Sequence, residues 1–405
     1  MIRLGLPQKI RLFGQQSPSH SRGGRTLPEK PRAVKAEEFD LLRVLVDEAF
    51  ERSDDRGNPM YEDHPHLFNL NNINNLRVIV ENDVVISHVG MTIRWSTILG
   101  CTVKVANAGA IGTHKSFRGQ GYATALCEDA ILHAAAAGVD FMMISGERSL
   151  YHRLGSRPVG KDWEFAIPAQ NAAAVQRGDV IPSRFKNADL QAVMRLHELE
   201  PVRQVRPLDE WRRVIRDGHT TQHNAEVWVV RRGRAVVACL GVLPADSSKF
   251  SVLQEFIGDR RSVLSALSGV IKRTKLAGLT LNVQGYDGLF LSLLALSGVK
   301  GEPRHADGTF MIINFTQFME RIRPLIEERV GLQDASRIGF NKVAGRCLFL
   351  CDGEVLIDTD IGGASQIIFG THESIEWNCV GNVPGKELLE ASFPIPTVTS
   401  GFSYV

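Results

Sequence analysis

Residues Ala110–Ala123, which read AIGTHKSFRGQGYA, decide how this sequence is interpreted. A strand-forming run, Thr102–Ile111, leads into the stretch, and apolar residues at helical spacing follow it until Gly138. A glycine-containing turn between a strand and a helix presents backbone N–H groups and the positive end of the helix to a ligand. The stretch therefore predicts a cradle for a pyrophosphate, which Gly119 and Gly121 allow to approach closely.

The loop also has the spacing of a known family. Arg118-x-x-Gly121-x-Ala123 matches the loop (Gln or Arg, two residues, Gly, one residue, Gly or Ala) of the GNAT superfamily of acetyltransferases, and the chain resembles that superfamily here. It is neither a Walker loop nor a dinucleotide-binding fingerprint, and a plain glycine turn is the alternative. The resemblance implies acetyl-CoA as the acyl donor. The residues expected to bind it are Ile111, Gly112, Thr113, Arg118, Gly119, Gln120, Gly121, Tyr122 and Ala123.

The segments on either side of the loop are expected to form one folded unit that begins at Pro31. Periodicity and turn residues predict, in chain order, a helix over Glu37–Glu51, a loop over Pro59–Asn75, a hairpin over Leu76–Trp95, the central strand and its helix, a strand over Phe141–Gly146, a short helix over Ser149–Gly155 and a strand over Trp163–Ile167. This is the element order of GNAT domains. His64 and His66 are expected in the loop, because Pro65 breaks any helical register for a metal site.

The middle third repeats that order without the phosphate loop. The expected elements are helices over Asp189–Glu198 and Leu208–Asp217, a hairpin over Val227–Leu243, a strand over Phe250–Ile257, a helix over Ser262–Lys275, a strand over Leu279–Gly285, a short helix over Gly288–Gly298 and a strand over Phe310–Asn314. Gly258–Ser262 offers one glycine and no Arg-x-x-Gly-x-Ala. This indicates a duplicated unit that kept the fold and lost the cofactor site.

The last third differs from both repeats. It predicts a helix from Thr316, a hairpin turning at Asp352-Gly353, a helix over Ala364–Phe369 and a tail, Thr397–Val405, that prolines direct. The predicted fold class is α/β (α+β): tandem GNAT-like domains with mixed central sheets over residues 31–168 and 169–314, followed by a small α+β domain over 315–405. Residues 1–30 are basic and rich in Gly, Ser and Pro, and are expected to form a disordered tail.

Together these features resemble the enhanced-intracellular-survival (Eis-like) acetyltransferases over nearly the whole chain after residue 30. The resemblance is carried by Gly109–Thr113 with the phosphate loop, by Leu150–Gly155, by Gly308–Asn314 and by the ending Phe393-Pro-Ile-Pro with Ser403-Tyr-Val405. It implies a C-terminal domain like a sterol carrier protein, a homo-oligomer (a hexamer in that family), and primary-amine substrates such as polyamines, aminoglycosides or lysine side chains. Close relatives have an arginine-rich loop, whereas Arg118 is its only basic side chain here.

Acyl transfer from a thioester needs donors for the oxyanion and an acid for the leaving thiolate. Backbone groups of Ile111 and Thr113 are expected to bind the pantetheine arm and the thioester carbonyl, with plain strand pairing as the alternative. Tyr151, on the short helix that faces the sulfur in this fold, is the expected acid, because a phenol stays protonated at neutral pH. A packing role is the alternative. His152 and Glu147 flank it and are expected at the pocket rim.

A base for the amine is less evident. The central strand, Val103–Thr113, contains neither Asp nor Glu. In the Eis-like family the terminal main-chain carboxylate takes this role, and the resemblance implies the same for Val405. An ordinary frayed terminus is the alternative.

The composition of the 405 residues limits other functions. Hydrophobic residues make up 43% and charged residues 23%, as in soluble globular proteins of two or three domains. A net charge of +2 argues against nucleic acid as a partner, and no apolar run is long enough for a membrane span. The cysteines are expected to be buried thiols in a reducing cytosol, rather than a metal site formed by Cys347, Cys351, His372 and Cys379.

The sequence thus predicts a cytoplasmic, acetyl-CoA-dependent N-acetyltransferase that acts on a primary amine by direct transfer. Two alternatives remain open. One is a non-catalytic acyl-CoA sensor with the same fold, and the other is a lipid-binding or scaffold protein that uses the C-terminal domain.

Overall fold

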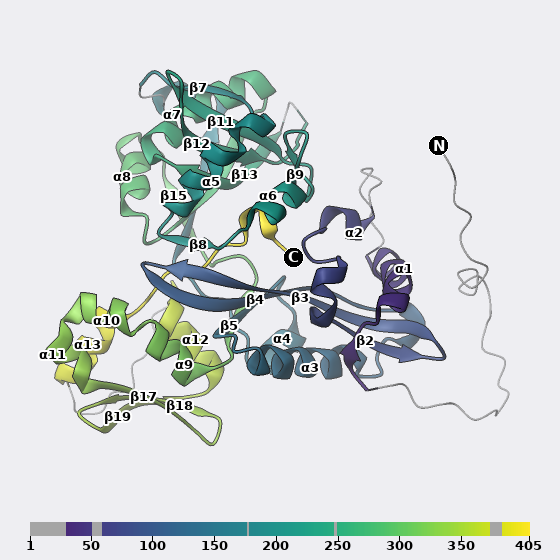
Figure 1. The fold of residues 1–405 in the computed structure, drawn as a ribbon. Helices are drawn as coiled ribbons and strands as arrows, with labels where there is room; N and C mark the ends of the chain where they lie inside the picture. The colour runs from purple at the N-terminus through teal and green to yellow at the C-terminus, as the bar shows by residue number, and fades with distance from the viewer. Residues whose placement is uncertain (1–29, 51–58, 176–177, 247–248, 373–382) are drawn as a thin grey trace.

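The computed structural model describes residues 30–50, 59–175, 178–246, 249–372 and 383–405. The expected basic tail lies outside these ranges except for Lys30, and Cys379 lies outside them as well. Three units follow one another along the chain, each built on its own sheet (Figure 1). Within the described ranges, no helix combines the length and apolarity needed to cross a bilayer.

The first sheet has seven strands in the order β1-β2-β3-β4-β5-β16, with β8 beside β3. These strands are β1 (Arg32–Ala33), β2 (Leu76–Glu81), β3 (Val84–Ile98), β4 (Cys101–Thr113), β5 (Phe141–Ile144), β8 (Val202–Gln204) and β16 (Thr309–Ile312). Side chains alternate between the two faces, so one face packs on α1 (Phe39–Ala49) and the other on α3 (Tyr122–Ala136). β4, which runs parallel to β5, is therefore covered on both sides.

Two short helices replace the loop expected over Pro59–Asn75. They are α2 (Met60–Asp63) and a 3-10 helix over Leu70–Asn75. The side-chain amide of Asn72 donates to the carbonyl of Met91, which fixes the second helix to β3. Residues 64–69, with His64 and His66, form a loop as expected, whereas the two short helices were not predicted because such long-range hydrogen bonds leave no periodic pattern in the sequence.

The second sheet has nine strands in the order β15-β6-β14-β13-β12-β11-β10-β9, with β7 beside β11. These strands are β6 (Asp162–Pro168), β7 (Ile181–Arg184), β9 (Ile215–Arg216), β10 (His219–Thr220), β11 (Glu226–Arg232), β12 (Ala235–Val242), β13 (Phe250–Gly258), β14 (Gly278–Gln284) and β15 (Gly301–Arg304). The helices of this unit are α5 (Leu190–Glu198), α6 (Leu208–Val214), α7 (Arg260–Thr274) and α8 (Gly288–Leu296). α6 ends before the expected Asp217 because the chain turns into β9.

The first two units exchange strands: the second unit contributes β8 and β16 to the first sheet, and the first unit contributes β6 to the second sheet. β6, expected to close the first unit, pairs with β14 and β15 of the second. β16, expected to close the second unit, pairs with β5 of the first. β6 has seven residues and β16 has four, and a local strand pattern does not specify which strand of another sheet becomes its partner. The expected boundaries at residues 168 and 314 therefore do not separate the strands of the first sheet from those of the second.

The third unit has the strands β17 (Ile338–Val343), β18 (Arg346–Cys351) and β19 (Glu354–Thr359), paired in that order. Its helices are α9 (Phe315–Arg321), α10 (Arg323–Val330), α11 (Leu332–Arg337), α12 (Ile361–Phe369) and α13 (Val383–Ser392). The single helix expected from Thr316 is divided into α9 and α10, and α11 and α13 have no counterpart in the sequence prediction. The ring centroid of Phe141 on β5 lies 4.9 Å from that of Phe369 and 5.3 Å from that of Phe318. These aromatic contacts join the third unit to the first.

The last thirteen residues return through all three cores. Phe393 and Ile395 pack in the core shared with the third unit, Phe402 packs against Trp211 in the second, and Val405 is buried in the first. Figure 1 shows this yellow segment ending at the centre of the molecule, where the first and second units meet. The tail is directed, as its prolines predict, but it ends in a 3-10 helix over Gly401–Ser403 rather than in a fully extended segment.

Candidate active site

A cavity of about 610 Å³ opens over the N-terminal end of α3, beside β4 and α4 (Ser149–Arg153). Gly119 and Gly121 have φ angles of 77° and 85°, in the left-handed region that favours glycine, and Gly121 is the N-cap of α3. A Cβ added to either glycine would meet no atom within 4 Å. The loop therefore presents bare backbone to open space at the positive end of a helix whose first turn has no acidic residue.

Nearly all residues expected to bind the cofactor line this cavity: Ile111, Gly112, Thr113, Arg118, Gly119, Gly121, Tyr122 and Ala123. Gln120 does not line it. Its side-chain oxygen accepts a hydrogen bond of 3.3 Å from the hydroxyl of Tyr122. Arg118 donates from Nε to the carbonyl of Thr113, which ties the loop back to the end of β4.

The strand β4 bulges at the edge of the cavity. His88 pairs with Gly112 and Gly90 with Gly109, so that Ala110 and Ile111 together oppose one residue of β3. Ala110 has a φ of 50°, which is rare for a residue with a side chain. On the other side β4 pairs with β5 only as far as Ala108↔Ile144, so residues 109–113 of β4 have no partner in β5.

Tyr151 lies on α4 and lines the cavity, with only 2% of its surface exposed. Burial raises the pKa of its phenol above the ordinary value, so the hydroxyl keeps its proton at neutral pH. His152 and Glu147 pair with each other at 3.3 Å, and both are more exposed than Tyr151. Neither of them lines the cavity.

Val405 is buried against the opposite face of β4. A Cβ added to Gly109 would lie 2.5 Å from an oxygen and 2.6 Å from the carbon of the Val405 carboxyl group. The carbonyl oxygen of the preceding residue, Tyr404, accepts from His64 Nδ1 at 3.2 Å and from His66 Nε2 at 2.9 Å. The two loop histidines thus hold the end of the chain, a role that sequence spacing did not reveal.

The side chains of Tyr404 and Ser403 fix the tail further. The hydroxyl of Tyr404 lies 2.6 Å from Ser145 Oγ, directly after β5. Ser403 Oγ accepts from Arg206 Nε at 3.0 Å and donates to Glu210 Oε1 at 2.7 Å. All of these partners are distant in sequence, so no local motif could have identified them.

Residues 30–159 match the family model for an acetyltransferase (GNAT) domain. The first unit is a GNAT acetyltransferase domain. The chain is accordingly an acyltransferase, and the cavity over α3 lies within the matched residues. No curated protein sequence matches the chain.

Solved structures share the fold over nearly the whole length. They include a GCN5-related N-acetyltransferase from Kribbella flavida, at 13% identity and a TM-score of 0.63, which covers 93% of this chain and 98% of that chain. One from Anabaena variabilis has 14% identity and a TM-score of 0.61, covering 91% and 98%. Eis1 from Mycobacterium abscessus has 13% identity and a TM-score of 0.58, covering 94% and 100%. The chain therefore has the Eis-like fold that the sequence predicts.

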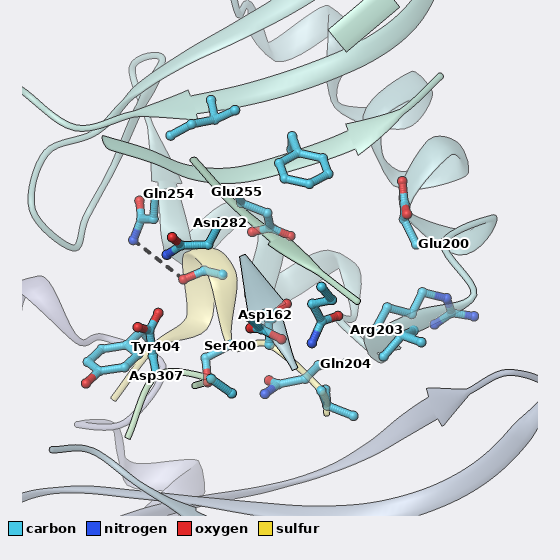
Figure 2. A pocket seen from close by; sticks show the side chains of 18 of the residues that line it. Asp162, Glu200, Arg203, Gln204, Gln254, Glu255, Asn282, Asp307, Ser400 and Tyr404 are labelled. Atoms are coloured by element: carbon cyan, nitrogen blue, oxygen red, sulfur yellow. Dashed lines mark hydrogen bonds between the residues drawn. The ribbon is translucent and has the colours of Figure 1, made fainter. Parts of the chain in front are cut away.

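A second cavity, of about 460 Å³, lies between the GNAT domain and the second unit. Figure 2 shows Asp162, Gln204, Asp307 and Tyr404 among the side chains around it. Asp162 is buried, and burial together with the nearby Asp307 raises its carboxyl pKa to about 7. Both polar atoms of the Gln204 side chain are buried without a partner among the described residues. The cavity therefore offers polar groups that are free to bind a ligand.

The part of the chain that the structure describes has no cluster of three residues able to hold a metal ion. Cys347 and Cys351 are buried on β18, while Cys379 lies outside the described residues.

Gly121→Asp tests the acyl-CoA site. We expect the folded variant to lose acetyl-CoA binding, because its carboxylate would face the pyrophosphate at the N-terminus of α3. Gly345→Asp is the matched control, since Gly345 also has a positive φ and open space but lies in the turn between β17 and β18. Calorimetry measures both affinities. Near-wild-type affinity in a folded Gly121→Asp protein would contradict this assignment of the site.

Proposed function

We propose that this chain is an acetyl-CoA-dependent N-acetyltransferase that transfers the acetyl group directly to a primary amine. One arrangement supports the proposal: Tyr151 and Val405 are buried on opposite faces of the first sheet, next to the bulge of β4. With the pyrophosphate held at α3, the thioester would extend along β4 to this point. An acid and a base on either side of a thioester are what transfer to an amine requires.

In the proposed reaction, the amine nitrogen forms a bond to the thioester carbonyl carbon, and the C–S bond then breaks. The terminal carboxylate that Val405 bears in this sequence is the base that takes the proton from the amine. Tyr151 gives its phenolic proton to the departing thiolate, and its raised pKa keeps that proton in place until then. The backbone N–H of Ile111, in the bulge, stabilises the negative charge on the carbonyl oxygen.

The amine is proposed to enter from the cavity between the units. Tyr404 lines that cavity and directly precedes Val405. The end of the cavity beside Tyr404 therefore lies close to the proposed base. Asp162 lines this cavity, and Asp307, which pairs with Arg304, lies near it. Carboxylates in a partly desolvated cavity attract ammonium groups, which supports a cationic amine as the substrate class.

Release of the CoA thiol from acetyl-CoA with a panel of primary amines tests the proposed activity. Turnover with any of them establishes it. Binding of acetyl-CoA without thiol release for every amine would instead fit the acyl-CoA sensor.

Tyr151→Phe removes only the acidic proton. We expect kcat to fall about 10²-fold or more while acetyl-CoA affinity stays near that of the wild type, because the phosphate loop is untouched. Tyr61→Phe is the control, since Tyr61 lies on α2 and lines neither of the two cavities. Steady-state kinetics and calorimetry measure the two quantities. An unchanged kcat would mean that water or another residue protonates the thiolate.

Gly109→Ala tests the proposed base. The new Cβ would displace the Val405 carboxyl group, so we expect kcat to fall about 10²-fold with acetyl-CoA binding retained. A peptide tag after Val405 should have the same effect. Gly288→Ala is the control, because a Cβ there meets no atom within 4 Å. If the Gly109→Ala variant and the tagged protein both acetylate the amine at the wild-type rate, the base lies elsewhere, and Glu147 or a water chain is the next candidate.

Asp162→Asn tests the proposed amine site. Because the carboxyl pKa is about 7 in the folded chain and about 4 when unfolded, the wild type loses stability as pH rises between these values. The variant should be more stable than the wild type at pH 8, by up to about 4 kcal/mol, and equally stable at pH 4. Its KM for the amine should rise, because the negative charge is gone. Denaturation at both pH values and amine kinetics measure this; an unchanged KM would exclude Asp162 from amine binding.

A further inference from the structure

His88 lies in the middle of β3, under the bulge of β4, with none of its surface exposed. Its Nδ1 is 3.0 Å from the carbonyl oxygen of Ala110. A carbonyl only accepts, so Nδ1 must carry the proton and donate it. Burial lowers the pKa of the imidazole to about 4, and the ring is therefore neutral near pH 7.

The other ring nitrogen, Nε2, makes a histidine energetically unfavourable as a purely packing residue at this position. Nε2 is buried and has no hydrogen-bond partner among the described residues. The ring is tilted against Phe68 at a centroid distance of 5.7 Å, in an otherwise apolar environment that includes Leu67. A leucine or phenylalanine would fill such a space without leaving a buried polar atom unpaired. The hydrogen bond to Ala110 is thus the one interaction that an apolar residue could not supply.

That hydrogen bond acts on the peptide between Ala110 and Ile111. Ala110 has left-handed backbone geometry, which a residue with a side chain keeps only where its surroundings hold it. In a trans peptide the C=O and the following N–H point in opposite directions. Because His88 binds the carbonyl of Ala110, the N–H of Ile111 points away from His88, and Ile111 lines the acyl-CoA cavity.

We propose that His88 is a positioning residue for acyl transfer, whose Nδ1–H holds the Ala110–Ile111 peptide so that the N–H of Ile111 faces the thioester carbonyl oxygen. His88 itself touches neither the substrate nor the acyl donor. The inference rests on the proposed role of Ile111 as oxyanion donor and does not depend on the base. Loss of one such donor lowers kcat by about 10²–10³-fold in other enzymes. Loss of its support should therefore cost about 10- to 100-fold.

Three substitutions at His88 separate positioning from packing. The side-chain amide of His88→Asn places a donor near the position of Nδ1, that of His88→Gln places it near Nε2, and His88→Leu has none. The readouts are kcat, the affinities for CoA and acetyl-CoA, thermal stability, and the infrared carbonyl stretch of bound acetyl-CoA labelled with ¹³C at that carbonyl. A hydrogen bond to the carbonyl lowers the stretching frequency.

We expect His88→Asn to keep the lowered frequency and to retain kcat within a few-fold. His88→Leu and His88→Gln should show a frequency closer to that of free acetyl-CoA and a kcat about 10- to 100-fold lower, with CoA affinity unchanged. Wild-type kcat and frequency in His88→Leu would overturn the proposal, as would equal losses in all three variants in proportion to their unfolded fraction. If the wild type turns over no amine, the proposed function fails, and the infrared comparison still tests His88 by itself.

Discussion

The hydroxyl of Ser403 sits between two buried ion pairs, and the geometry of the active site depends on that contact. It accepts from Arg206, which pairs with Glu255 at 3.3 Å, and donates to Glu210, which pairs with Arg94 of β3 at 3.0 Å. Buried charges are tolerated only when all of them are paired and hydrogen-bonded, so the network favours a single arrangement. That arrangement joins the GNAT domain, the second unit and the tail at one point.

The tail reaches this point only because each unit contributes to its path. Phe393 and Ile395 are buried in the core of the third unit, and Phe402 is buried against Trp211 in the second. Val405 then fills the space that Gly109 leaves on β4. A change in the packing of the third unit would therefore alter the position of the terminal carboxyl group. In this sense the proposed site depends on the whole chain, although the cavity over α3 lies within the GNAT domain.

The parts of the fold that sequence could predict are those fixed by local patterns. The phosphate loop, the helix that follows it and the position of Tyr151 each depend on glycines and periodicity within a few residues. The exchange of β6 and β16 depends instead on pairing with strands that are distant in the sequence. No sequence motif indicates the roles of His64, His66 and His88. Each binds a backbone carbonyl group that becomes its neighbour only after folding.

The helix of the second unit that corresponds to α3 begins with a different N-cap. In the second unit the N-cap of α7 is Asp259, whose carboxylate accepts from the backbone N–H of Ser262. A carboxylate at this helix end takes up donors that a pyrophosphate would need, and it repels the negative charge. In the GNAT domain Gly121 leaves the same end open. With its own site closed, the second unit instead supplies walls of the cavity where the proposed amine would bind, through strands such as β13 and β14. Under the proposed function, the acyl donor therefore binds to the GNAT domain, and the second unit contributes to binding of the acceptor.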